Sequence, residues 1–265
     1  MKNDSDLIIS LTSYPGRISV VHKTVESLLN QTVRPDLVVL WLAPEQFPNK
    51  EKDLPDTLRS LIGHGLTVDW YADIKSYKKL IPTLIKYPNA TIITADDDII
   101  YPRNMVADLL DMHKRRPMDI CAHRIRKINI KHNRIMPYIN WHLSERRHSI
   151  FNLFRRHSYK FLCGTGAGTL YPPHSLHPDV LNADKFMCLC PYQDDIWFWA
   201  MAVHNNRKIS PTTTGYKLSK HVINQVQSTG LWDTVNSAVE SPNNTAINNV
   251  INEYPDIAEK IGLII

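Results

Sequence analysis

The chain has 265 residues, a length that fits one large domain or two small ones. Hydrophobic residues make up 43% of it and charged residues 22%, which excludes collagen-like and broadly disordered chains. No apolar run approaches the roughly 20 residues that a membrane-spanning helix needs, and the N-terminus lacks the pattern of an export signal, so we expect a cytoplasmic protein.

The first hundred residues alternate short, β-rich apolar runs with helical patterns, as in a parallel sheet with crossover helices. Strands are predicted at 7–11, 37–42, 67–71 and 91–95, and helices between them at 20–29, 55–62 and 77–87. After Pro102 the alternation fades. There we expect a small-residue loop at 164–168 and helices at 105–114, 196–205 and 245–254. The sequence therefore predicts a single α/β domain with a mostly parallel sheet.

The sharpest pattern is a run of three carboxylates, Asp96-Asp97-Asp98, directly after the strand-like run 92–95. Adjacent negative charges repel one another, so this arrangement needs strong solvation or a bound cation. Ligands of open α/β sheets bind beyond the carboxyl ends of the strands, where this triplet falls. Carboxylate oxygens suit Mg²⁺ or Mn²⁺, which also bind substrate phosphates. A solvated acidic turn is the alternative interpretation.

A second acidic group, Asp194-Asp195, opens the aromatic run 196–199. Acidic side chains at the start of a helix are favoured by capping and by the helix dipole, so a structural role is one interpretation. The other is that two adjacent carboxylates give one of them a raised pKa, and with it the role of a general base, while tryptophan faces hold a sugar ring. The position of the pair relative to Asp98 decides between these interpretations.

The order and spacing of several segments resemble the nucleotide-sugar glycosyltransferases of the GT-A fold, in particular glycosyltransferase family 2 and its bacterial polysaccharide relatives. These segments are 9–17, 78–82, 95–102, 166–172 and 194–197, and the similarity runs from about residue 7 to 235. The resemblance implies one GT-A domain, 1–265, with a mostly parallel central sheet flanked by helices. Within it, 1–104 would bind the nucleotide sugar and 105–265 the acceptor.

The same resemblance implies an activity. A sugar would move from a nucleoside diphosphate sugar, expected to be a UDP-sugar, to a hydroxyl of a glycan or a polyprenyl-diphosphate-linked acceptor. The reaction would invert the anomeric carbon and serve the synthesis of a bacterial surface polysaccharide.

Roles for single donor-side residues follow from the resemblance. Thr12, Tyr14 and Arg17 after the first strand are implied in contacts to the nucleotide, and Asp73 in a contact to the base ring. Lys78 or Lys79 would neutralise diphosphate charge, and a solvated helix face is the alternative for either lysine. Asp96 and Asp98 are the implied ligands of Mn²⁺ or Mg²⁺, and Asp96 is also a candidate for the ribose. Asp97 stays a candidate for the donor site, and His221, 26 residues after Asp195, for the metal.

The chemistry implied for the acceptor side follows from charge. A divalent cation bridging the diphosphate oxygens stabilises the leaving group, and a carboxylate removes the proton of the attacking hydroxyl. Asp195 is the implied base, and Asp194 orients the acceptor or caps the helix. Gly166, Gly168 and Trp197 are expected at the acceptor, with a plain turn as the alternative for the glycine loop.

A basic segment, 113–160, contains thirteen Lys and Arg against only two acidic residues, although the whole chain carries a net charge of +5. A solvated basic face is one interpretation. Apolar anchors beside cations at 150–156 are typical of a segment that lies on a membrane, so we expect peripheral contact with anionic lipid on the inner face of the cell membrane. No RNA-binding motif is visible, and no nucleic-acid partner is expected.

Two other functions stay open at this stage. A sugar-phosphate nucleotidyltransferase shares the general architecture, but it needs a glycine-rich loop with Arg and Lys after the first strand, and the sequence at 12–17 lacks one. A non-catalytic module that binds carbohydrate or a polyanion would use the carboxylates only structurally. The motifs of dinucleotide-binding dehydrogenases, P-loop NTPases, zinc proteases and α/β-hydrolases are absent from the sequence.

Overall fold

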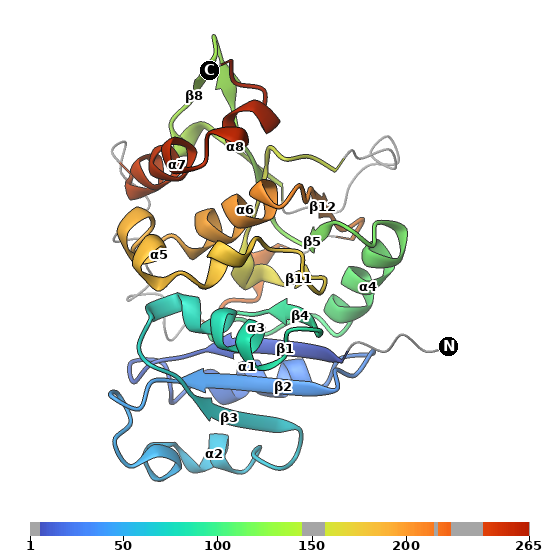
Figure 1. The fold of residues 1–265 in the computed structure, drawn as a ribbon. Coiled ribbons are helices and arrows are strands. Elements are labelled where there is room, and N and C mark those ends of the chain that lie inside the picture. The colour runs from blue at the N-terminus through green and yellow to red at the C-terminus, as the bar shows by residue number, and fades with distance from the viewer. Residues whose placement is uncertain (1–5, 145–156, 215–216, 224–240, 265) are drawn as a thin grey trace.

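A computed structural model describes residues 6–144, 157–214, 217–223 and 241–264 (Figure 1). Its N-terminal part holds four parallel strands, in the spatial order β3-β2-β1-β4. They are β1 (Leu7–Thr12), β2 (Leu37–Leu42), β3 (Leu66–Trp70) and β4 (Thr91–Thr94). Each lies within one residue of the predicted strand at either end. β1, β2 and β4 are mostly apolar and buried because both faces of the sheet are covered there, whereas β3, at the edge of the sheet, is largely half-buried.

Three further strands complete a seven-stranded sheet beyond β4. They are β11 (Thr169–Tyr171), β5 (Ile120–Ala122) and β12 (Ile209–Pro211). β11 is antiparallel to both β4 and β5, whereas β12 is parallel to β5. None of these three strands is predicted from the sequence, although the sheet continues through them. Each of these strands has only three residues, which is too short to show a periodic pattern. The predicted fold class, an α/β domain with a mostly parallel sheet flanked by helices, is confirmed.

Helices cover both faces of this sheet (Figure 1). They are α1 (Val21–Leu29), α2 (Asp56–Arg59), α3 (Ile81–Lys86), α4 (Met105–Arg115), α5 (Ala183–Leu189), α6 (Asp194–His204), α7 (Pro242–Glu253) and α8 (Pro255–Lys260). Alternate strand residues face opposite sides, so each side has its own core. Ile9 packs in a cluster with residues of α1, α2 and α4, and Ile8 in a second cluster with residues of α3 and α6.

Two predicted helices differ from the observed ones. The helix predicted at 77–87 is divided into a 3₁₀ turn, Lys75–Lys79, and α3. Pro82 lies in the first turn of α3, where its missing N–H costs no hydrogen bond, and a new helix can begin there. The helix predicted at 55–62 is a single turn, α2. The other predicted helices have counterparts in α1, α4, α6 and α7.

Helix α6 runs through the centre of one core. Every residue from Ile196 to Val203 is buried, as expected for a helix that is apolar on all sides. Only its first residues, Asp194 and Asp195, carry charge into this region. The helix thus delivers an acidic pair to the interior of the molecule.

Part of the basic segment contributes to a separate small layer, whereas β5, which also lies within 113–160, belongs to the main sheet. Three strands, β6 (Ile125–Lys127), β9 (His142–Ser144) and β10 (Phe161–Cys163), make an antiparallel sheet, next to a hairpin of β7 (Ile130–Lys131) and β8 (Arg134–Ile135). The hairpin lies near the C-terminus, well separated from α4, whose last turn is also basic (Figure 1). The membrane segment predicted at 150–156 lies outside the described residues. Within the described ranges, no helix has both the length and the apolar character to cross a bilayer.

The order of the strands indicates where a ligand binds. The chain passes from β1 through α1 to β2 on one side, and then returns to place β4 on the other side of β1. The crevice between the carboxyl ends of β1 and β4 is therefore the switch point of the sheet, the usual binding place in open α/β folds. The loop after β1 and the triplet after β4 meet at this crevice.

Candidate active site

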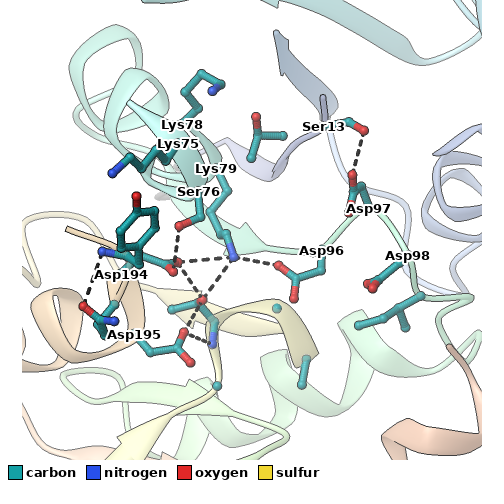
Figure 2. Close-up of a pocket in the computed structure, with 18 of the residues that line it drawn as sticks. Ser13, Lys75, Ser76, Lys78, Lys79, Asp96, Asp97, Asp98, Asp194 and Asp195 are labelled. Atoms are coloured by element: carbon teal, nitrogen blue, oxygen red, sulfur yellow. Dashed lines mark hydrogen bonds and ion pairs between the residues drawn. The ribbon is translucent and has the colours of Figure 1, made fainter. Parts of the chain in front are cut away.

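A cavity of about 610 Å³ lies at the carboxyl ends of β1 and β4. Its walls come from the loops after these strands, the 3₁₀ turn before α3, the loop 164–167 and the first residues of α6 (Figure 2). Most of the residues predicted for the site line this one cavity: Thr12, Tyr14, Arg17, Asp73, Lys78, Lys79, Asp96, Asp97, Asp98, Gly166, Asp194 and Asp195. The two acidic groups, about a hundred residues apart in the sequence, thus share one space.

The three carboxylates of the triplet have different environments. Asp97 is buried and accepts hydrogen bonds from Ser13 Oγ at 2.6 Å and from Arg17 Nη1 at 2.8 Å. A third bond, from Thr24 Oγ1 to the Asp97 carbonyl at 3.0 Å, fixes its backbone. Asp97 therefore anchors the loop after β4 to the loop after β1, whereas Asp96 and Asp98 extend from that anchor along the cavity (Figure 2).

Asp98 pairs with the same guanidinium, at 3.0 Å from Arg17 Nη1. Burial, and next to it the negative charge of Asp96, raise the pKa of Asp98 to about 6 although Arg17 opposes the shift. Two partly buried carboxylates that repel one another in this way form a place where a cation is favourable. Asp96 and Asp98 therefore fit a divalent cation.

Among the described residues, no group of three or more His, Cys, Asp or Glu surrounds a ready metal site. A cation at Asp96 and Asp98 would thus take most of its oxygen ligands from elsewhere. Mg²⁺ commonly binds in this way, through one or two carboxylates together with substrate phosphates and water. The donor set accordingly fits a metal that arrives with a phosphorylated ligand.

Tyr101 holds the backbone of the triplet in place. Its hydroxyl accepts a hydrogen bond from the Asp96 N–H at 2.8 Å and donates one to the carbonyl of Gly166. Gly166 lies against the Asp96 side chain, and a Cβ at this position would meet the carboxylate. The glycine loop therefore makes room for Asp96, a role that differs from the expected close approach of backbone to a sugar.

The acidic pair at the start of α6 is hydrogen bonded within the same cavity. Asp194 is almost fully buried and accepts from Ser76 Oγ at 2.9 Å. Asp195 accepts from the backbone N–H of Thr165 at 2.9 Å and from the Thr165 hydroxyl. Burial, and then the charge of Asp194, raise the pKa of Asp195 to about 6, against the opposing effect of Lys79. A carboxylate with such a pKa is ionised near neutral pH and still accepts a proton readily, as a general base must.

A third group of polar residues in the cavity surrounds Asp73. This carboxylate accepts hydrogen bonds from Gln46 Nε2 at 2.9 Å and from the Lys75 N–H at 3.0 Å, and it pairs with Lys78. Burial, the largest single effect, raises the pKa of Asp73, but the hydrogen bonds and charges of Lys78 and Lys75 together lower it below its ordinary value. Asp73 and Lys78 are thus an ion pair in the cavity wall, in which the lysine is buried and the carboxylate is partly exposed.

Three of the predicted site residues do not line the cavity. Trp197 is completely buried in the core, and its indole N–H donates to the carbonyl of Val180 at 3.2 Å, so its placement gives no support to the expected acceptor contact. Gly168 lies beyond the loop with a φ of +87°, in the region that favours glycine. His221 lies beside the segment after Asp98, and its Nδ1 donates to the carbonyl of Ile100 at 3.0 Å.

Other cavity residues carry no sequence signal of their own. Ser13, Ser76 and Thr165 bind the carboxylates. Arg124 and Tyr138 also line the cavity. Thr165 lies between the two glycines of the loop 164–166, which is the one hint that the sequence offers for it. These residues are recognised only when the fold brings distant segments together.

Comparisons with known proteins are consistent with the fold. No protein-family model matches the chain, and no curated protein matches it significantly. Solved structures with a similar fold include TarS from S. aureus, with 15% identity over 80% of this chain and 59% of that one, at a TM-score of 0.47. They also include the mannosyltransferase PcManGT from Pyrobaculum calidifontis in complex with GDP-Man and Mn²⁺, with 10% identity, coverage of 82% and 58%, and a TM-score of 0.47.

A third structure is a 4-diphosphocytidyl-2C-methyl-D-erythritol synthase, with 11% identity over 86% of this chain and 97% of that one, at a TM-score of 0.49. The chain spans less than two thirds of TarS and of the mannosyltransferase but nearly all of the synthase. Every identity is below 25% and every TM-score below 0.5, so these similarities extend only to the general α/β fold. Because these similarities concern the fold alone, the function must be argued from the cavity.

Proposed function

We propose that this chain is a metal-dependent glycosyltransferase that moves a sugar from a nucleoside diphosphate sugar, a UDP-sugar in the first instance, to an acceptor hydroxyl. One observation carries the proposal: the strand-end carboxylates Asp96 and Asp98 and the helix-start carboxylate Asp195 line the same cavity at the switch point of the sheet. A solvated acidic turn and a purely structural helix start do not account for this convergence.

The donor half of the reaction requires positive charge opposite the diphosphate. A divalent cation, Mn²⁺ or Mg²⁺, held by Asp96 and Asp98 with His221 as a further candidate ligand, supplies that charge when it is bound. Arg17 fixes the position of Asp98 and adds a permanent charge beside it. Thr12, Tyr14, Asp73 and Lys78 line the nucleotide side of the cavity and would bind the base and the ribose.

The acceptor half requires a base. Asp195 would take the proton from the attacking hydroxyl onto its carboxylate, with Thr165 holding the carboxylate in place through two hydrogen bonds. Asp194 would orient the acceptor or cap the helix. Transfer with inversion follows from a base that faces the attacking hydroxyl rather than the leaving group. Gly166 and Gly168 remain proposed for the acceptor side, and the acceptor itself is proposed to be a surface glycan or a polyprenyl-diphosphate-linked oligosaccharide.

A panel of nucleotide sugars tests this function. With Mn²⁺ present, one donor should raise the melting temperature and be slowly hydrolysed to its nucleoside diphosphate, and both effects should disappear with EDTA. A nucleotidyltransferase would instead release pyrophosphate from a nucleoside triphosphate and a sugar phosphate. Absence of any metal-dependent nucleotide affinity in isothermal titration with UDP and Mn²⁺ would show a non-catalytic binding module and refute the proposal.

Membrane contact by 113–160 is a separate part of the proposal. Lys114, Arg115 and Arg116 are exposed at the end of α4, and Lys131 and Arg134 on the hairpin of β7 and β8. Each Lys or Arg near an anionic surface contributes about 1 kcal/mol to binding. Flotation with anionic and neutral liposomes at low salt tests this contact: equal recovery with both would rule it out.

A further inference from the structure

Lys79 lies between the two acidic groups of the cavity. Its Nζ lies 2.6 Å from Asp96 Oδ1, 3.2 Å from Asp194 Oδ2 and 3.3 Å from Thr165 Oγ1 (Figure 2). The side chain is 7% exposed. A single buried ammonium thus joins the carboxylate after β4 to the acidic pair at the start of α6.

Carboxylates surround this ammonium. Asp96 and Asp194 contact it directly, and Thr165, which it also contacts, binds the carboxylate of Asp195. The neighbouring Lys78 is also buried, but it points away from both acidic groups and pairs with Asp73 instead (Figure 2). Of the two adjacent lysines, Lys79 is therefore the one that is committed to the catalytic carboxylates.

Building on the proposed function, we infer that Lys79 is a positioning residue, which holds Asp96 and the pair Asp194-Asp195 in register and keeps Asp195 ionised for proton transfer. The resemblance to glycosyltransferases suggests that Lys79 meets the donor diphosphate. The geometry points instead to a role through other residues, because Nζ is directed at oxygens of Asp96, Asp194 and Thr165.

The groups that face Asp195 make the effect of Lys79 specific. Asp194 disfavours the ionised form of Asp195, and Lys79 favours it. The other titratable neighbours are Tyr77, Tyr138, Tyr171 and Cys163, and burial raises the pKa of each of them, so they are uncharged at neutral pH. Removal of the charge on Lys79 should therefore raise the pH at which Asp195 loses its proton.

The test follows the carboxyl carbon of Asp195 by ¹³C NMR in metal-free protein, with the resonance assigned by its loss in Asp195→Asn. The Lys79→Met variant should titrate about one pH unit higher than the wild type. Lys79→Arg keeps the charge and should titrate as the wild type does. Lys86→Met removes an exposed lysine of α3 that pairs with Asp69, and serves as the matched control without effect.

Activity provides a second measurement. In donor hydrolysis with the nucleotide sugar found in the panel, Lys79→Met should lose about fivefold more rate at pH 6 than at pH 8, as a one-unit rise from a pKa of about 6 requires. Should Lys79→Met fail to fold, Lys79→Gln carries the same test, because its amide keeps a hydrogen-bond donor and removes the charge.

An unchanged Asp195 midpoint in folded Lys79→Met or Lys79→Gln, or an equal loss of rate at all pH values, would overturn the inference and leave Lys79 a merely structural residue. Failure of the proposed function looks different. In that case the wild type turns over no donor at all, while the NMR titration can still be read.

Discussion

Gly166 and Asp96 lie in direct contact, and a Cβ on Gly166 would stand only 1.6 Å from Oδ2 of Asp96. An alanine at 166 must therefore displace the carboxylate. We expect Gly166→Ala to weaken metal-dependent donor binding at least tenfold by isothermal titration. Gly63→Ala is the control: a Cβ there meets nothing within 4 Å, but its φ is +79°. It should cost about 1 kcal/mol of stability and leave the donor affinity unchanged. Normal donor affinity in Gly166→Ala would contradict the role given to Asp96.

Asp98→Asn removes one of the two carboxylates that fit the cation. Turnover should be lost, and so should the increase in UDP affinity that Mn²⁺ causes, because an amide offers the metal a neutral and weaker ligand. Isothermal titration with and without Mn²⁺ measures this. Asp69→Asn, a carboxylate of β3 that does not line the cavity, should behave as the wild type. A metal effect that survives in Asp98→Asn would assign the cation to other residues.

Asp195→Asn should separate chemistry from binding. The amide cannot accept the proton, so turnover should fall by about a hundredfold or more, while donor affinity stays nearly intact. Steady-state transfer rates and donor titration on the same preparation check both halves of this statement. A variant that kept more than about a tenth of the rate would show that another group removes the proton.

The pKa of Asp195, raised to about 6 by burial and by Asp194, sets the expected pH profile. The base must be ionised, so kcat should fall about tenfold per pH unit below pH 6 and reach a plateau above it. Stability should respond in the opposite direction. The folded state holds this proton more tightly than the unfolded state does, so the free energy of unfolding should decrease as pH rises from about 4 to 6. Urea titrations of the wild type and Asp195→Asn should differ in that pH range.

Arg17→Ala should destabilise the fold as well as the site. It leaves the buried carboxylate of Asp97 without its ion-pair partner, and such losses commonly cost about 3 kcal/mol or more. Arg59→Ala removes an exposed ion pair with Asp56 and should change stability by less than about 1 kcal/mol. Urea unfolding compares the two. Equal small losses would show that Asp97 is well solvated without Arg17.

The sequence predicts the parts of this molecule that depend on local pattern. The strands before the triplet are long apolar runs, and the position of Asp96–Asp98 beyond β4 follows from that run alone. The acidic pair is found for the same reason, as two carboxylates at the head of an apolar helix. What the pattern leaves undecided is whether the pair is structural, because this depends on a distance between segments far apart in the chain.

Other expectations depend on how the fold packs. The sequence predicts Trp197 at the acceptor because aromatic rings often hold sugars, but α6 is buried on all sides, and a run of apolar residues does not show whether one side of a helix is exposed. The contacts of Lys79 could not be read from the sequence either. It pairs with Asp96, which follows β4, and with Asp194, which begins α6, and only the packed fold brings these residues to one lysine.

Helix α6 is packed on all sides, whereas the nucleotide side of the cavity is made of loops. In the proposed function, the base is thereby carried on a fully packed helix. Insertions or exchanges in the surrounding loops can alter which sugar or acceptor fits, while the proton acceptor keeps its place. This arrangement allows the substrate to differ between related chains while the base stays the same.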